Sequence, residues 1–253
     1  PPAEAAEVRG AMRRWMRDVR RRAPEIAAAE GWFSAKVEVA QEEKRLRVVL
    51  TPGERATVAS VKIEFRGDLA GEGAFREARR LSLEREWRLP AGATFRQAAW
   101  DEAKARLVEA LRADDYATGE LLASEARVDA ASARVRIRLV VDSGPAFSLG
   151  AVTVSGLSRY SPKLVERMLD IDPGEPYRSE RLLDLQRALQ STPWFANVVV
   201  EIERDPSRPT RVPVRVAVLE RPVADVGLSV GYGTDTGARG EVPLRYRDVL
   251  GLG

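Results

Sequence analysis

The chain has 253 residues, of which 41 are basic and 38 acidic, and a net charge of +3. It contains no cysteine and no histidine, which excludes disulfides, thiolate metal sites and catalysis by a Ser-His or Cys-His pair. Hydrophobic residues make up 44% and charged residues 31%, proportions typical of folded modules with solvated faces. These features predict two or three small domains, no transmembrane helix, no cofactor and no enzymatic activity.

A basic run stands near the start of the chain, and it contains Arg13, Arg14, Arg17, Arg20, Arg21 and Arg22. On a helix these side chains would spread around most of the circumference, with Trp15 and Met16 among them. We interpret the run as a solvated helix face, with anionic lipid or a partner protein as the alternative. No nucleic-acid-binding module accompanies it, so we expect no nucleic-acid partner.

The first elements are a helix and a β-hairpin. Residues 3–22 are helix formers, Pro24 predicts a restart over Glu25–Glu30, and Gly31 predicts the end of that second helix. Apolar residues then alternate with polar ones in two short runs, at Val37 and Val39 and at Leu46, Val48 and Leu50. This period of two predicts a hairpin.

The same order of elements then occurs twice more, each time behind a strand. The second unit has a strand at Val61–Phe65, helices over 72–87 and from Phe95, and a hairpin over 118–129 and 132–141. The third has a strand at Val152, helices over 160–170 and 180–190, the latter capped by Ser179, and a hairpin from PWFANVVVEI to RVPVRVAVLE. An aromatic residue precedes each hairpin, and we interpret all three as core residues: Phe33, Tyr116 and Phe195. The recurrence predicts an α+β fold of tandem repeats.

The last stretch, residues 223–246, alternates in the manner of a hairpin. Val226, Leu228, Val230 and Tyr232 alternate with small or polar residues, the turn TDTGARG follows, and a second alternating run contains Val242, Leu244 and Tyr246. The stretch is typical of one hairpin of an outer-membrane β-barrel, although an ordinary soluble hairpin would show the same period.

Repeated strand-helix-helix-strand-strand units ahead of GYGTDTGARG resemble the periplasmic POTRA domains and first barrel hairpin of the BamA/TamA superfamily. The segments WRLPAGATFRQAAWDEAKARL and GEPYRSERLLDLQRALQSTPWFANVVVEI are similar to those of its TamA-like members. The resemblance implies three POTRA domains, at 1–54 with its opening strand missing or atypical, at 55–143 and at 144–221. Residues 222–253 would then begin a truncated transmembrane barrel, with Val226, Leu228, Val230 and Tyr232 facing lipid.

This resemblance also implies a function. The barrel would lie in the outer membrane of a Gram-negative cell and the repeats in the periplasm. Its partners would be a TamB-like protein anchored in the inner membrane and unfolded outer-membrane clients, autotransporters among them, with phospholipid transport as a further role. A BamA-type assembly factor, a two-partner secretion transporter and a purely structural spacer are the alternatives.

A sheet edge offers unpaired main-chain groups to an extended peptide, so strand addition suits the handling of many different clients. We expect the first strand of each hairpin to be such an edge, at Lys36–Gln41, Gly119–Glu125 and Asn197–Ile202. The most apolar of these is the candidate partner-binding strand, with residues Asn197, Val198, Val199, Val200, Glu201 and Ile202. The alternative is that this strand is simply buried within its domain.

Overall fold

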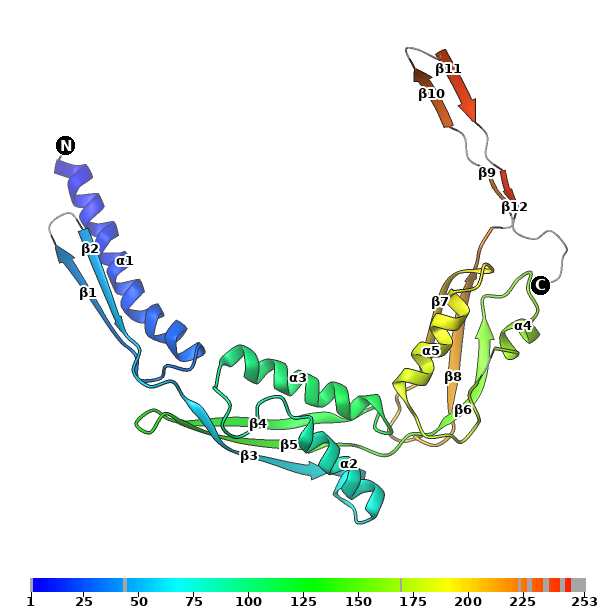
Figure 1. Ribbon diagram of the computed structural model, residues 1–253, viewed down its shortest axis with the longest axis horizontal. Helices are drawn as coiled ribbons and strands as arrows, with labels where there is room; N and C mark the ends of the chain where they lie inside the picture. The colour runs from blue at the N-terminus through cyan, green and yellow to red at the C-terminus, as the bar shows by residue number, and fades with distance from the viewer. Residues whose placement is uncertain are drawn as a thin grey trace. The chain divides into compact units, whose positions relative to one another are not determined.

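The computed structural model describes residues 2–42, 45–168, 170–222, 224–226, 229–233, 237–241 and 244–246 (Figure 1). The chain divides into two compact units. Unit 1 contains Pro1–Arg112 and Thr118–Pro145, and unit 2 contains Ala113–Ala117 and Ala146–Gly253. Both units combine helices with three-stranded sheets, so the fold is α+β, as the sequence predicts.

Unit 1 begins with one long helix, α1 (Pro2–Ala29), and the antiparallel pair β1 (Lys36–Glu42) and β2 (Arg45–Thr51). The predicted break at Pro24 is wrong, because the helix runs through this residue. Proline removes one main-chain hydrogen bond from a helix. Tertiary contacts hold α1 on both sides of Pro24: Ala27 is buried, and the Arg20 guanidinium donates to the Val39 carbonyl of β1 at 2.8 Å.

The second repeat of unit 1 is β3 (Thr57–Arg66), the short 3-10 helix η1 (Gly67–Ala70), α2 (Ala74–Arg85), α3 (Gln97–Ala113), β4 (Glu120–Asp129) and β5 (Arg134–Asp142). Strand order is β3-β5-β4, with β3 parallel and β4 antiparallel to the central β5. Alternate residues of β5, such as Ile137 and Leu139, are buried together with Leu107 and Leu111 of α3. Figure 1 shows α3 lying along the sheet.

Unit 2 repeats this topology with β6 (Leu149–Ser155), α4 (Pro162–Glu166), α5 (Ser179–Gln190), β7 (Phe195–Ile202) and β8 (Val212–Glu220). Strand order is β6-β8-β7, again with a parallel first strand and an antiparallel second strand around a central third. The first strand ends at a glycine with positive φ in both repeats, Gly67 and Gly156. A Cβ at Gly156 would overlap the Val218 carbonyl, so this turn requires glycine.

The α3–β4 connection is part of the core of unit 2. Asp115 N–H donates to the Tyr177 carbonyl at 2.7 Å, and Phe147 N–H donates to the Asp115 carbonyl at 2.7 Å. Ala117 is buried in one cluster with Phe147 and Tyr177. The folding unit therefore includes residues that precede position 144, the predicted start of the third domain.

Residues beyond 222 form short antiparallel pairs. β9 (Ala224–Val226) pairs with β12 (Leu244–Tyr246), and β10 (Ser229–Gly233) pairs with β11 (Gly237–Glu241). Val226 lies opposite Leu244, Val230 opposite Gly240 and Tyr232 opposite Ala238. Leu228 and the side-chain orientations along this stretch lie outside what the structure describes, so the lipid-facing assignment stays a prediction.

Candidate functional site

The strand that the sequence singles out, β7, is an edge of its sheet. It pairs with β8 along one side, from Phe195 opposite Glu220 to Ile202 opposite Val214. Its residues differ in exposure: Phe195 and Val198 are buried, whereas Val199 is 43% exposed. One long side of the β7 main chain therefore faces away from the sheet, which is the position that strand addition needs.

Core packing holds β7 in place. Phe195 is 1% exposed, and the Tyr160 ring meets it edge-on with centroids 6.2 Å apart. Leu185 and Leu189 of α5 belong to the same buried cluster, together with Val198. The aromatic ahead of this hairpin is therefore a core residue, as predicted, and α5 lies beside the strand that it supports (Figure 1).

Two glutamine side chains from α5 bond to the outward main-chain groups of β7. Gln190 Nε2 donates to the Val198 carbonyl at 3.2 Å, and Val200 N–H donates to Gln186 Oε1 at 3.3 Å. In an antiparallel pair, main-chain groups of successive residues point to alternate sides. Val199, opposite Ala217, is therefore the residue that bonds to β8, while Val198 and Val200 point outward.

These glutamines are functional candidates that sequence reasoning missed. They stand one helical turn apart on α5, next to a leucine stripe, and polar residues at such positions usually face solvent. Only their spacing of four residues marks them in the sequence. Together they supply the edge with one donor and one acceptor in place of a neighbouring strand.

The far end of β7 is charged. Glu203 Oε2 accepts from Arg215 at 2.8 Å, and its other oxygen accepts from Arg208 at 3.3 Å. The Ser207 hydroxyl, the Ser207 N–H and the Arg208 guanidinium, in that order, lower the pKa of Asp205 to about 2. This turn stays charged over the physiological pH range and limits the apolar part of the edge to the strand itself.

Glu220 is the last residue of β8 and lies opposite Phe195, the first residue of β7. Its side chain holds this end of the strand pair in place. Burial alone would raise the pKa of this carboxyl, whose side chain is 5% exposed. The N–H groups of Ser158, Arg159 and Tyr160 donate to it at 2.9, 3.0 and 3.1 Å, and the Ser158 hydroxyl donates at 2.8 Å. These bonds outweigh burial and lower its pKa to about 2. The carboxylate thereby ties the end of β8 to the loop after β6.

The other predicted edges occupy equivalent strands: Lys36–Gln41 lies in β1, and Gly119–Glu125 leads into and along β4. Among the described residues no group of three or more acidic side chains could hold a metal ion. None of the helices in the described part of the chain has the length and apolarity needed to cross a membrane.

Comparison with known proteins adds independent information. The family model for POTRA, described as a surface antigen variable number repeat, matches residues 147–221. The outer membrane protein assembly factor BamA of Neorickettsia risticii is 25% identical over 121 residues, which are 48% of this chain and 16% of that protein. The chain therefore spans a small part of the curated relative that it matches.

A solved structure also shares the fold, with a TM-score above 0.5. BamA from Haemophilus ducreyi lacking POTRA domains 1–3 is 15% identical, with a TM-score of 0.56 over 78% of this chain and 35% of that one. POTRA domains 3–5 of Haemophilus influenzae BamA are 21% identical, with a TM-score of 0.49 over 76% of this chain and 74% of that one. At 15% identity the likeness to the Haemophilus ducreyi protein bears on the fold alone.

Proposed function

We propose that the chain is a member of the BamA/TamA superfamily and that its repeats form a periplasmic arm of an outer-membrane assembly protein, because the POTRA family model matches residues 147–221 and BamA is similar in sequence. In this proposal the arm holds extended segments of client or partner chains by strand addition at β7. The proposed domains are residues 1–54, 55–143 and 144–221, the last of which packs with residues 113–117, followed by the start of a barrel at 222–253.

One observation carries the proposal: the β7 main chain points outward at Val198 and Val200, and among the described residues only side-chain amides bond to it there. A side-chain amide can rotate away, whereas a neighbouring strand of the same sheet cannot leave without unfolding. Strand addition would exchange two isolated bonds for a continuous ladder. Such a ladder involves main-chain groups, so it suits clients of different sequence.

The finer assignments rest on the resemblance in sequence. They are a TamB-like partner anchored in the inner membrane, autotransporters among the clients, and phospholipid transport as a further role. A barrel hairpin with Val226, Leu228, Val230 and Tyr232 toward lipid belongs to the same group. We propose the TamA-like role ahead of a BamA-type assembly factor or a two-partner secretion transporter because the segments WRLPAGATFRQAAWDEAKARL and GEPYRSERLLDLQRALQSTPWFANVVVEI are similar to those of TamA-like members.

A structural spacer is the second candidate, and the junction between the first two repeats of unit 1 favours it. Arg96 Nε donates to Glu30 Oε2 at 2.9 Å, and Arg55 Nε donates to the Glu30 carbonyl at 3.0 Å. The Phe33 and Phe95 rings lie 5.9 Å apart. A joint with this many specific contacts would keep two repeats at a set angle, whether or not an edge binds clients.

Photo-crosslinking of the full-length protein separates the two functions. A photoreactive residue at Val199 should capture a urea-denatured outer-membrane protein on dilution, and the same residue at Ala151, on the opposite edge strand β6, should capture less. A proline at position 200 removes an outward N–H and should abolish capture, whereas one at 199 would remove a bond within the sheet. Circular dichroism checks that Val200→Pro folds. Equal capture from β6 and β7, unchanged by this proline, would support the spacer.

A further inference from the structure

The outer side of β3, in the second repeat, combines an open strand edge with a cavity. β3 pairs with β5 on one side. On its other side the first residues are already paired: Gly92 N–H donates to the Val58 carbonyl at 2.8 Å, and Val58 N–H donates to the Ala93 carbonyl at 2.9 Å. This short antiparallel bridge, centred on Thr57 and Thr94, ends where Pro90 turns the chain away. The edge therefore accepts antiparallel main chain, and its own loop covers only the start.

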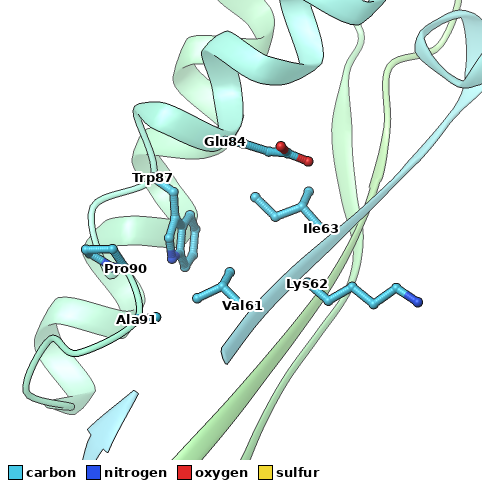
Figure 2. Close-up of a pocket in the computed structure, with 7 residues that line it drawn as sticks. All are labelled: Val61, Lys62, Ile63, Glu84, Trp87, Pro90 and Ala91. Atoms are coloured by element: carbon cyan, nitrogen blue, oxygen red, sulfur yellow. The ribbon is translucent and has the colours of Figure 1, made fainter. Parts of the chain in front are cut away.

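A cavity of about 360 Å³ lies immediately beyond that bridge. Its lining residues are Val61, Lys62, Ile63, Glu84, Trp87, Pro90 and Ala91. Figure 2 shows the side chains of Val61 and Ile63 on the same side as Trp87 and Glu84, while Lys62 points away from them. The side of β3 that faces α2 is thus largely apolar.

Trp87 forms a fixed wall of this cavity. It is 6% exposed, and its Nε1–H donates to the Leu89 carbonyl at 2.7 Å. The Trp100 ring meets it nearly edge-on, with centroids 6.1 Å apart and planes at 75°. A wall held by a hydrogen bond and a ring contact is preorganised, so an entering apolar side chain need not order it. The Glu84 carboxylate stands beside it and disfavours an acidic side chain in the cavity.

The opposite face of the same sheet is charged, with a small excess of basic side chains. Because side chains of a strand alternate between faces, Lys62 shares the open face with Arg138, which lies opposite it in β5. The basic residues on this face are Lys62, Arg66, Arg127, Arg134, Arg136 and Arg138, and the acidic ones are Glu64, Glu120, Glu125, Asp129 and Asp142, the pair Glu120 and Asp142 standing at the strand ends away from Lys62. Arg127 and Arg136 lie directly opposite each other, an arrangement of like charges that an incoming anion would relieve. Within the described residues Lys62 has no ion-pair partner.

We propose that the β3 edge binds an extended peptide whose side chains alternate between apolar and acidic. The peptide continues the antiparallel pairing that Gly92–Thr94 begins. Its apolar side chains enter the cavity against Trp87, and its acidic ones lie on the open face near Lys62. Glu84 and Lys62 together set which face each kind of side chain occupies, so this edge is selective for a pattern. The site is separate from β7 and does not depend on the function proposed there.

Fluorescence anisotropy with the full chain tests this inference. The probe is a labelled peptide of about eight residues, a usual strand length, with alternating leucine and aspartate. The comparison peptides have the same composition in two blocks, or lysine in place of aspartate. We expect the alternating acidic peptide to bind at least about tenfold more tightly than either, since neither places apolar and acidic groups on opposite faces. Equal affinity for all three would overturn the proposal.

Two variants test the two faces separately. Lys62→Glu should lower the affinity for the acidic peptide and raise the affinity for the lysine peptide. Lys163→Glu, at an exposed lysine of α4, should change neither affinity. Ala91→Phe fills the cavity and should weaken both alternating peptides, whereas Ala130→Phe, in the β4–β5 turn, should not. Circular dichroism and thermal melting confirm that each variant is folded. Unchanged affinity in both folded test variants would contradict the inference.

Two further controls distinguish strand addition at β3 from binding at β7 or to lipid. Val200→Pro in β7 should leave the peptide affinity unchanged, so failure of the β7 proposal would not appear here. Methylating alternate peptide nitrogens on one edge or the other should abolish binding in one case only, because strand addition uses one edge of the peptide. Binding of phosphatidylglycerol vesicles that is lost in Lys62→Glu, without peptide binding, would overturn the proposal in favour of a lipid-facing surface.

Discussion

β4 and β7 hold the same place in two copies of one fold, yet their edges are protected by different means. β4 is covered by charge: Glu120, Glu125, Arg127 and Asp129 are exposed along it, and the Arg127–Glu125 pair is 2.6 Å apart. β7 is apolar from Val198 to Val200 and is covered by two side-chain amides. Charged edges repel added strands at all times, whereas an amide cover can be displaced. The difference marks β7 as the edge suited to regulated binding.

The difference between the two edges comes from the helices next to them, α3 beside β4 and α5 beside β7. When buried Leu107 and Leu111 of α3 are matched with Leu185 and Leu189 of α5, Arg112 corresponds to Gln190. Both donate to a main-chain carbonyl of the adjoining strand segment, Arg112 Nε to Gly119 at 2.5 Å and Gln190 to Val198 at 3.2 Å. The position of Gln186 corresponds to Val108, which cannot accept a hydrogen bond. One of the two covering contacts is thus shared, and the other belongs to the third repeat alone.

The largest effect is expected in the core that supports β7. Phe195→Ala should lower the free energy of unfolding by about 3–5 kcal/mol, because it removes a fully buried ring and leaves a cavity. Leu122→Ala, on β4, should change it by less than about 0.5 kcal/mol, since that side chain is 46% exposed. Denaturant titration followed by circular dichroism measures both. Similar losses of stability in the two variants would mean that the core stabilises the two edge strands to the same extent.

The next effect concerns the anchor at the end of β8. Glu220→Gln should cost about 2 kcal/mol, because a buried carboxylate that accepts several hydrogen bonds is replaced by a group that accepts fewer. Asp142→Asn, at the matching position of β5, should cost less, since the half-buried Asp142 carboxylate accepts from Gly144 N–H at 2.8 Å in a single turn. Denaturant titration of the two variants against the native chain gives both values, and an equal loss would contradict the asymmetry.

Glu220 also predicts a dependence on pH. Its pKa is about 2 in the folded chain, below the ordinary glutamate value of about 4.3 in an unfolded one. A lowered pKa contributes stability that is present above the unfolded pKa and is lost as pH falls toward the folded one. The native chain should therefore lose part of its stability between about pH 4.3 and 2, and Glu220→Gln should lose less over that interval. If the free energies of unfolding of the two chains fall equally between these pH values, this carboxyl is not the cause of the loss.

A smaller effect is expected at the cover of β7. Gln186→Ala combined with Gln190→Ala should raise the affinity of a strand-forming client peptide about tenfold, because two bonds of about 1 kcal/mol each need no longer be displaced. Arg187→Ala, an exposed residue of the same helix, is the matched control. Anisotropy of a labelled peptide measures the change. A decrease in affinity would instead mean that the glutamines contact the bound peptide.

Much of this fold follows from sequence patterns. Periods of two and of helical spacing predict the hairpins and helices, and the recurring aromatics predict the core positions at Tyr116 and Phe195, which are fully buried. Rules that use only neighbouring residues in the sequence fail where contacts between distant elements determine the structure. Ser179 does not cap α5, which begins at that residue after Arg178 and has no side-chain cap. Gln186 and Gln190 escape prediction because their partners are main-chain groups of another element, and sequence spacing does not show which edge they reach.

The smallest predicted effect would transfer the missing contact to the second repeat. Val108 is half-buried on α3, where Gln186 stands on α5. Val108→Gln should place an acceptor near the outward N–H groups at the start of β4 and slow their hydrogen exchange about threefold, equivalent to roughly 0.6 kcal/mol. Val108→Leu, which keeps the bulk without the acceptor, is the control. If both substitutions have the same effect, the matching of the two helices does not determine how an edge is covered. A slowing confined to glutamine would show that one side chain converts a charged edge into an amide-covered one.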